Sequence, residues 1–259
     1  MAVDPGARPA EDSMTERLFP YHLTAERAPR LGLVVLQADE TIEGDFRRLV
    51  PPEVELLVSR VPSGREVTPD TLTAMADDLA GAASLFPEGS TFDALAYACT
   101  SGAAQIGPAR VAELLRPVLQ ARAVTDPVTA LIAACRKMGL GRIALLSPYT
   151  APVSAKLRAA LSQAGIETPI CGSFGVAEEA IVARIASQAI LDACAELVAS
   201  EDVDGLFLSC TNLRVLDLIA PLETRLGMPV LSSNLVLAWH LLTLAGRDPS
   251  GFHPARLFG

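Results

Sequence analysis

Two stretches of the sequence share one pattern: LAYACTSGA, residues 95–103, and LFLSCTNLR, residues 206–214. Each runs through apolar residues to a cysteine, Cys99 or Cys210, which a threonine and then small or polar residues follow. The apolar run predicts a buried strand, and the residues after it can begin a helix. The sequence therefore places the same Cys-Thr pair at the carboxyl ends of two buried strands.

The two stretches belong to a longer internal repeat. FDALAYACTSG begins at Phe92 and VDGLFLSCTNL begins at Val203, with Asp, Leu, Cys and Thr in the same four places. RLGLVVL at Arg30 and RIALLSP at Arg142 are separated by almost the same stretch of chain. Two matches at nearly one spacing indicate two copies of one unit. If the copies face each other, the two thiols flank a single ligand, because ligands bind beyond the carboxyl ends of parallel strands.

Apolar runs that suit buried strands alternate along the chain with helical patterns. This alternation predicts an α/β fold, in which parallel sheets are covered by helices on both faces. We expect strands at residues 30–36, 54–61, 93–99, 141–148, 168–174, 204–210 and 228–233, and helices that include 69–86, 107–120, 151–165 and one long helix over 178–200.

Composition limits the classes of partner. The 259 residues carry a formal net charge of −9 without a basic cluster, which argues against nucleic acid and anionic membrane surfaces. The sequence contains no run of about 18 uncharged apolar residues, so we expect no membrane-spanning helix. Residues 1–20 lack the apolar core of a signal peptide and are expected to form a flexible arm. Five cysteines without an export signal predict reduced thiols in the cytoplasm.

The positions of Cys99 and Cys210 predict reactive thiols. A thiol between a strand end and a helix start meets free backbone N–H groups and the positive end of the helix dipole, so we expect a lowered pKa. The N–H groups after each cysteine, from Thr100 and Ser101 and from Thr211 and Asn212, are expected to hold a substrate carboxylate. Cys is also a common buried packing residue, which is the interpretation that we prefer for the remaining cysteines, Cys135, Cys171 and Cys194.

Other chemistries lack their sequence signals. The three histidines, His22, His240 and His253, are far apart, and no CxxC or HExxH motif is present, so we expect no metal site. No glycine-rich nucleotide motif occurs, and we expect no cofactor.

The order of these motifs resembles the aspartate/glutamate racemase superfamily, and within it the branch of maleate isomerases and arylmalonate decarboxylases. The matching segments are LGLVVLQADETIEGDF, YACTSG, LLSPYT, LFLSCTNLR and PVLSSNLVLAWHLL. The chain is also similar to ectoine-utilisation proteins of that branch. The resemblance implies two pseudosymmetric α/β lobes with cofactor-independent chemistry in the cleft. We expect the first lobe to comprise residues 21–122 and 233–259, and the second to comprise residues 123–232.

The resemblance also implies roles for single residues. Cys99 and Cys210 match the two catalytic cysteines, and Tyr149 matches a tyrosine whose hydroxyl binds a substrate carboxylate. The remaining matches are to residues that bind substrate: Thr100 and Ser101 in one turn, Thr211 in its counterpart, Gln37 at a strand end where maleate isomerases usually have Asn, and Ser233 and Asn234 at the cleft. Ser233 and Asn234 also suit a helix cap equally well. The second Asn of the isomerases is not evident, since Phe174 and Gly175 stand in that region.

The function expected from these residues is a two-cysteine isomerase or racemase that acts on a small carboxylate or dicarboxylate. Arylmalonate decarboxylases keep only the second cysteine, so a decarboxylase that uses Cys210 is the first alternative. The second is a carboxylate-binding protein without catalysis, in an ectoine-type catabolic pathway. The expected partner is the small carboxylate alone, and the chain is expected to form a homodimer.

Overall fold

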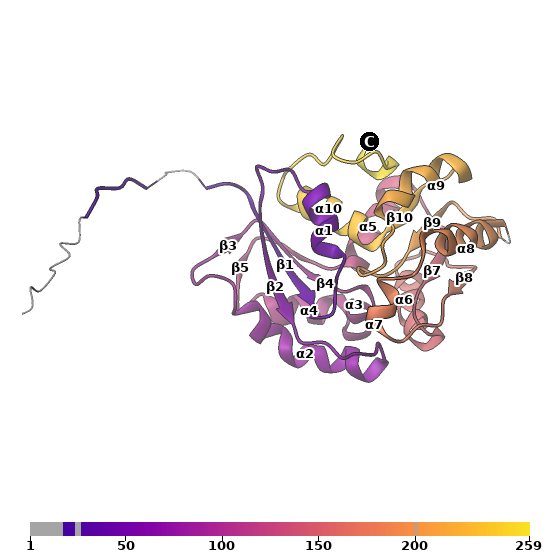
Figure 1. Cartoon of the computed structure of the whole chain (residues 1–259), viewed down its shortest axis with the longest axis horizontal. Coiled ribbons are helices and arrows are strands. Elements are labelled where there is room, and N and C mark those ends of the chain that lie inside the picture. Colours follow the sequence, from indigo (N-terminus) through magenta and orange to yellow (C-terminus); the bar gives the residue numbers. More distant parts are fainter. Residues whose placement is uncertain (1–17, 24–26, 200) are drawn as a thin grey trace, which may run out of the picture.

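Two four-stranded parallel sheets form the core of the protein (Figure 1). The computed structural model describes residues 18–23, 27–199 and 201–259. The first sheet has the order β2-β1-β4-β6, and the second has the order β8-β7-β9-β10. Their strands are β1 (Arg30–Leu36), β2 (Glu55–Val61), β4 (Ala94–Ala98) and β6 (Val124–Thr125), and β7 (Ile143–Ser147), β8 (Cys171–Ser173), β9 (Gly205–Leu208) and β10 (Val230–Ser232).

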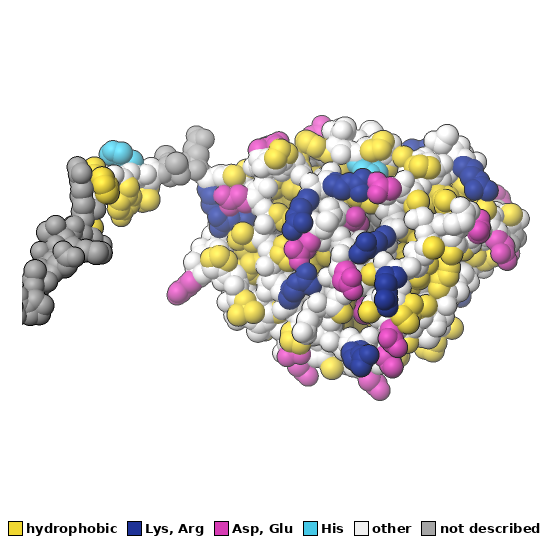
Figure 2. Space-filling model, viewed as in Figure 1, with side chains coloured by type: hydrophobic (Ala, Val, Ile, Leu, Met, Phe, Trp, Pro, Cys, Tyr) yellow, Lys and Arg dark blue, Asp and Glu magenta, His cyan; other side chains and the backbone are white. Residues whose placement is uncertain are grey.

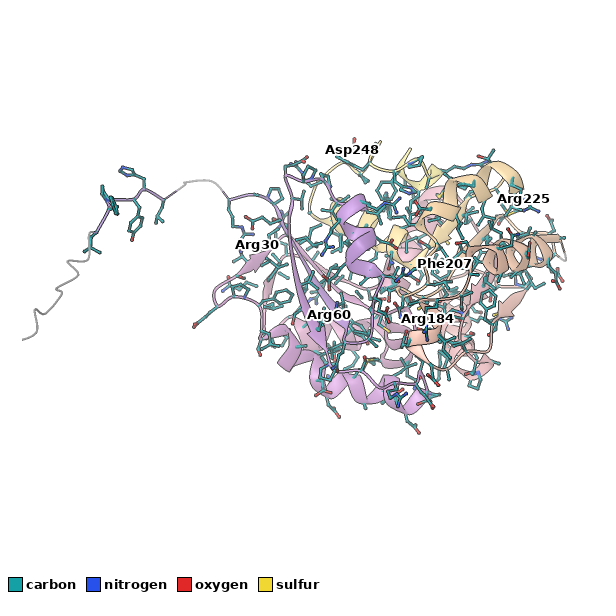
Figure 3. The ribbon with its side chains drawn as sticks, in the orientation of Figure 1. Arg30, Arg60, Arg184, Phe207, Arg225 and Asp248 are labelled. Atoms are coloured by element: carbon teal, nitrogen blue, oxygen red, sulfur yellow. The ribbon has the colours of Figure 1, made fainter. Side chains whose placement is uncertain are left out.

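The two sheets repeat one topology. In each, the first strand of the copy, β1 or β7, lies between the second and the third, and the fourth strand lies outside the third. The central strands are buried except at Arg30 and are almost entirely apolar, as the continuous apolar runs predict. Phe207 in β9 lies in the interior of the second lobe (Figure 3). The expected α/β fold with two lobes is confirmed.

Helices cover both sheets. Their bounds are α1 (Ile42–Leu49), α2 (Pro69–Ala83), α3 (Thr100–Ile106), α4 (Pro108–Leu115), α5 (Pro127–Met138), α6 (Ala151–Gln163), α7 (Glu179–Val182), α8 (Ser187–Ala199), α9 (Ile219–Leu226) and α10 (Ser233–Leu244), with short 3₁₀ turns at Leu216–Leu218 and Arg256–Phe258 and a small strand pair, β3 (Thr91–Phe92) and β5 (Gln120–Ala121). No helix in the described ranges is long and apolar enough to cross a membrane.

Helices α5 and α10 pack against each other where the lobes meet (Figure 1). Helix α10 follows β10 of the second sheet but packs on α1 and β4 of the first lobe. Helix α10 therefore lies against the first lobe, whereas the Arg256 N–H donates to Glu223 Oε2 in α9 of the second lobe at 2.9 Å. The assignment of residues 233–259 to the first lobe stays a prediction. Strand β6 pairs with β4, so the first sheet continues to Thr125, beyond the expected division after residue 122. The chain therefore crosses from the second lobe to the first between β10 and α10, and this crossing links the two lobes.

The prediction of one long helix over residues 178–200 is wrong. The chain forms α7, turns at residues 183–186, and begins α8 at Ser187. No glycine or proline marks this break. Backbone contacts from other segments hold α7: the Glu179 N–H donates to Arg65 O at 3.3 Å, and Asn212 Nδ2 donates to Glu179 O at 3.1 Å. Helix propensity is local and weak, so such contacts override it.

The expected arm of residues 1–20 lies outside the described residues except for 18–20. Leu18, Phe19, Tyr21 and Leu23 are exposed. On the face shown in Figure 2, basic and acidic side chains are interspersed over both lobes. Ion pairs among the described side chains include Arg60 with Glu43 and Arg48 with Asp217. This mixture fits a solvated surface better than a docking site for a polyanion.

Candidate active site

Cys99 caps the N-terminus of α3. Its backbone is extended, with φ −147° and ψ 117°, and its Sγ accepts a hydrogen bond from the Gly102 N–H at 3.2 Å. Ser101 Oγ lies 3.6 Å from the same sulfur. The strand end therefore delivers the thiol to a helix start, as the sequence predicts, and the thiol itself replaces the usual capping oxygen.

The glycine of the ACTSG segment is needed for close packing. A Cβ atom at Gly102 would overlap with Tyr97 Oη and would lie 3.1 Å from Cys99 Sγ. Any larger residue would therefore displace the Tyr97 side chain or the backbone beside the Cys99 thiol.

Cys210 reaches the site on a different backbone. Its φ is +111°, and among the described residues other than glycine it alone has a positive φ. Its Sγ accepts from the Asn212 N–H at 3.2 Å and lies 2.9 Å from the Tyr149 hydroxyl. A left-handed backbone at a residue with a side chain is strained, and such strain is concentrated at functional sites.

Ser233 joins the two Cys-Thr motifs. Thr100 Oγ1 donates to Ser233 Oγ at 2.7 Å, and the Cys210 N–H donates to the same oxygen at 2.9 Å. The helix cap falls instead on Ser232, whose hydroxyl accepts from the Leu235 N–H. Ser233 is thus free to bridge the lobes, and it brings two motifs that are far apart in sequence into one buried site.

A buried carboxylate, Glu179, lies on the Cys210 side of this site. Tyr149 Oη donates to Glu179 Oε1 at 2.9 Å, and Asn212 Nδ2 donates to Oε2 at 3.1 Å. Glu179 is not distinguishable from its exposed neighbour Glu178 in the sequence, because both fall at the start of the single long helix expected over residues 178–200. Tyr149 contacts both a thiol and a carboxylate.

Helix α1 holds the second motif from the first lobe. Asn234 Nδ2 donates to Asp45 Oδ2 and to Thr211 O, both at 2.8 Å. The Thr41 hydroxyl donates to Asn212 O at 2.9 Å. The predicted residues Thr211, Asn212 and Asn234 are therefore brought together, and their polar groups serve to fix the turn that follows Cys210.

Gln37 is not brought into this cluster. Its side chain is exposed, and within the described part of the chain no hydrogen bond joins that side chain to either cysteine. Its N–H donates to Val61 O, and its carbonyl accepts from Arg60. The hydrogen bonds of Gln37 therefore come from its backbone, just after the end of β1.

The expected lowering of the thiol pKa is wrong for this structure. Each cysteine is 3% exposed, and burial raises the pKa of Cys99 to about 11. Burial also raises the pKa of Cys210, and the charge of Glu179 adds to the effect at both thiols. The N–H donors act in the predicted direction, but the loss of hydration outweighs them. Burial raises the pKa of Glu179 as well.

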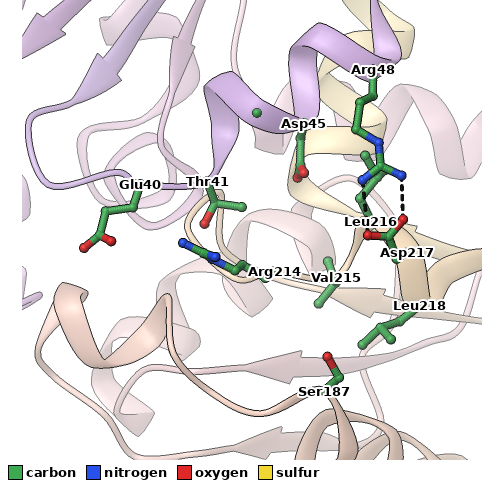
Figure 4. A pocket seen from close by; sticks show the side chains of 11 residues that line it. Glu40, Thr41, Asp45, Arg48, Ser187, Arg214, Val215, Leu216, Asp217 and Leu218 are labelled. Atoms are coloured by element: carbon green, nitrogen blue, oxygen red, sulfur yellow. Dashed lines mark hydrogen bonds and ion pairs between the residues drawn. The ribbon is translucent and has the colours of Figure 1, made fainter.

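A cavity of about 450 Å³ lies at the lobe boundary beside the second motif (Figure 4). Thr41 and Asp45 line it from the first lobe, and Arg214 and Asp217 line it from the second. Asp217 is paired with Arg48, whereas the exposed Arg214 side chain extends toward Glu40 and Thr41 (Figure 4). The cysteines are not among its lining residues, so both thiols are enclosed in this conformation.

Comparisons with known proteins agree with this architecture. A family model described as arylmalonate decarboxylase matches residues 31–258. The arylmalonate decarboxylase of Bordetella bronchiseptica is 31% identical over 222 residues, which cover 84% of this chain and 91% of that protein. The maleate isomerase of Pseudomonas putida, at 22% identity and a TM-score of 0.81, covers 90% of this chain and 98% of its own, and shares the fold.

A maleate cis-trans isomerase from Nocardia farcinica is also similar. Its structure with bound Tris is 27% identical, with a TM-score of 0.76, and the match covers 89% of this chain and 97% of that one. A mutant of that isomerase carries a covalently bound succinylcysteine intermediate. The family model spans both Cys-Thr motifs and nearly all of the described residues. The resemblance noted in the sequence is confirmed: the chain belongs to the arylmalonate decarboxylase family.

Proposed function

We propose that this protein is a cofactor-independent isomerase or racemase that acts on a small carboxylate through Cys99 and Cys210. The observation that carries the proposal is that both lobes supply a buried cysteine and that Ser233 joins their motifs. Two thiols on one ligand suit the removal of a proton from one face of a carbon and its return to the other.

In the racemase reaction, one cysteine thiolate takes the α-proton of the substrate. The electron pair of the broken C–H bond moves into the carboxylate as an enolate, and the other thiol donates its proton to the opposite face. In the cis-trans isomerase reaction, the Cys99 thiolate adds to one alkene carbon and Cys210 donates a proton to the other. The resulting C–C single bond rotates, Cys210 takes the proton back, and the C–S bond breaks, which restores the alkene and the Cys99 thiolate. Both reactions leave the enzyme with its original number of protons.

The developing negative charge needs donors that are already in place. Thr100, Ser101 and Thr211 are buried at the two motifs, and we assign the substrate carboxylate to them, with Tyr149 beside Cys210. A donor of this kind is worth about 3 kcal/mol in a site that excludes water. The raised thiol pKa values imply that substrate binding must favour the thiolate.

A decarboxylase that uses Cys210 alone is the second candidate. The 31% identical relative from Bordetella bronchiseptica favours it. In that reaction loss of CO₂ leaves the enolate, and Cys210 protonates it. Cys99 is then dispensable.

We further propose a cytoplasmic homodimer. All five cysteines are free thiols, which suits a reducing compartment. Size-exclusion chromatography with light scattering tests the dimer.

The deciding experiment is proton NMR in D₂O with small acids, on the wild type and on Cys99→Ala and Cys210→Ala. We expect deuterium at the α-carbon, or conversion of maleate to fumarate, and a loss of at least a thousandfold in each variant with both still folded. Decarboxylation that survives Cys99→Ala establishes the second candidate. Binding without turnover, unchanged by Cys→Ser at both sites, establishes the carboxylate-binding protein.

A further inference from the structure

Glu179 is carried into the site by a segment that is fastened to the opposite lobe. The Val67 N–H donates to Ala177 O at 2.8 Å, and the Glu179 N–H donates to Arg65 O. These bonds join residues 65–67 of the first lobe to the start of α7 in the second. The Glu179 side chain is 3% exposed, whereas Glu178 beside it is exposed. The inward position of Glu179 is therefore built by contacts between lobes.

The Glu179 carboxylate accepts hydrogen bonds from the side chains of two residues that contact Cys210. Tyr149 Oη gives its hydrogen to Oε1, and the Asn212 amide gives its two hydrogens to Oε2 and to Glu179 O. The hydroxyl that the family resemblance assigns to a substrate carboxylate thus already binds a carboxylate of the protein. Asp39, 4% exposed, adds a second negative group, since its charge also raises the pKa of Glu179.

We propose that Glu179 is the specificity-determining residue of the site, and that it selects a 2-amino monocarboxylate, whose ammonium group binds Glu179, over a dicarboxylate. The inference rests on the proposed function in one respect: the single substrate carboxylate is placed at the Thr100 and Ser101 turn. The substrate carbon then lies between Cys99 and Cys210.

The charge of Glu179 and its free hydrogen-bond acceptor positions both favour this substrate class. A second substrate carboxylate would meet Glu179 in a site shielded from water, where like charges repel strongly. An ammonium group would instead be attracted, and a carboxylate has about four acceptor positions, of which Tyr149 and Asn212 use two. The ammonium would also offset the charge with which Glu179 disfavours both thiolates, so its arrival would make proton removal easier.

The test uses matched pairs of ligands on the full chain: L-phenylglycine with phenylmalonate, and L-alanine with methylmalonate. Within each pair one ammonium replaces one carboxylate on the same carbon. Titration calorimetry measures affinity, and NMR in D₂O follows exchange of the α-proton. The proteins are the wild type, Glu179→Gln, and Glu178→Gln as the matched control on the exposed neighbour.

We expect the wild type and Glu178→Gln to bind the amino acid of at least one pair at least tenfold more tightly than its diacid. Glu179→Gln is expected to lose that preference and to gain affinity for the diacid. Tighter diacid binding by the wild type, or an unchanged preference in Glu179→Gln, would overturn the inference. The wild-type comparison decides alone if Glu179→Gln does not fold.

The two proposals fail in different ways. Amino-acid preference that depends on Glu179, without proton exchange, supports the role of Glu179 and rejects the two-thiol reaction. Isomerisation of maleate that needs both cysteines but is unaffected by Glu179→Gln supports the two-thiol reaction and rejects the role of Glu179.

Discussion

Cys99 and Cys210 follow corresponding strands of the two lobes, β4 and β9, and their surroundings differ. Cys99 has an extended backbone and caps a helix, and Ser101 Oγ lies 3.6 Å from its sulfur. Cys210 has a positive φ and contacts Tyr149, which is bonded to Glu179. The duplicated unit therefore places two thiols at one site without making them equivalent. Such a difference suits a reaction in which the two cysteines handle the proton in different steps.

After loss of either cysteine, the largest expected effect comes from removing the hydroxyl beside Cys210. Tyr149→Phe removes the hydroxyl that donates to Glu179 and contacts the Cys210 thiol, and we expect a loss of about a hundredfold in kcat, or about 3 kcal/mol. Tyr97→Phe is the comparison in the first lobe, because the Tyr97 side chain interacts with the Cys99 thiol as Tyr149 does with Cys210, but its hydroxyl lies 3.6 Å from Met75 Sδ and contacts no carboxylate of the described residues. Steady-state kinetics on the identified substrate compares them. Equal losses in both variants would mean that the two motifs are chemically alike.

The second prediction concerns the hydrogen bonds by which Asn234 joins Asp45 to the Cys210–Thr211 motif. Burial raises the pKa of Asp45 to about 6 from its ordinary value of 3.8. The folded protein then keeps a proton that the unfolded chain releases, so stability falls as pH rises from about 4 to about 6, by up to about 3 kcal/mol. Asp45→Asn does not titrate and escapes this loss.

Urea unfolding of the wild type and Asp45→Asn at pH 4, 5, 6 and 7 measures this pH dependence of the free energy of unfolding. The variant is expected to gain in stability relative to the wild type over that window and to keep the gain at pH 7. Asp39, Asp217 and Arg48 interact with Asp45 by charge, and the titrating groups farther from it are common to the two proteins and cancel. A difference that does not vary with pH would show that Asp45 keeps an ordinary pKa.

The third prediction concerns the bridge between the motifs. Ser233→Ala leaves the Thr100 hydroxyl and the buried Cys210 N–H without their common acceptor. We expect a loss of about 2 kcal/mol in the free energy of unfolding, because unpaired buried donors are costly. Ser232→Ala, which removes an ordinary helix cap, is the control, with an expected loss of about 1 kcal/mol. Chemical denaturation measures both, and a smaller loss in Ser233→Ala would contradict the bridge.

The smallest expected effect is a difference in stability between glycine and alanine variants, which depends on the backbone φ at positions 99 and 210. Glycine tolerates the φ of +111° at position 210, so Cys210→Gly is expected to be about 1 kcal/mol more stable than Cys210→Ala. At position 99 the order is reversed, because φ is −147° there and glycine only adds freedom to the unfolded chain. Thermal unfolding of the four variants tests this reversal. The same sign at both positions would mean that the two backbones are under similar strain.

Much of the architecture was predictable from the sequence. The strand expected at residues 30–36 coincides with β1, and the internal repeat appears as two sheets of one topology. The two cysteines lie at strand ends as predicted. Glu179 was not predictable, because the pattern of residues 178–200 is that of one amphipathic helix, and only contacts from Arg65 and Asn212 break it.

By itself, the sequence determined the alternation of strands and helices, the duplication, and the two Cys-Thr motifs. These features depend on local periodicity and on residue type, which are written in order along the chain. Only the tertiary structure decided the positive φ of Cys210, the raised pKa values of the thiols, and the inward carboxylate of Glu179. Each of these depends on burial and on hydrogen bonds between residues far apart, such as Thr100 and Ser233, 133 positions from each other.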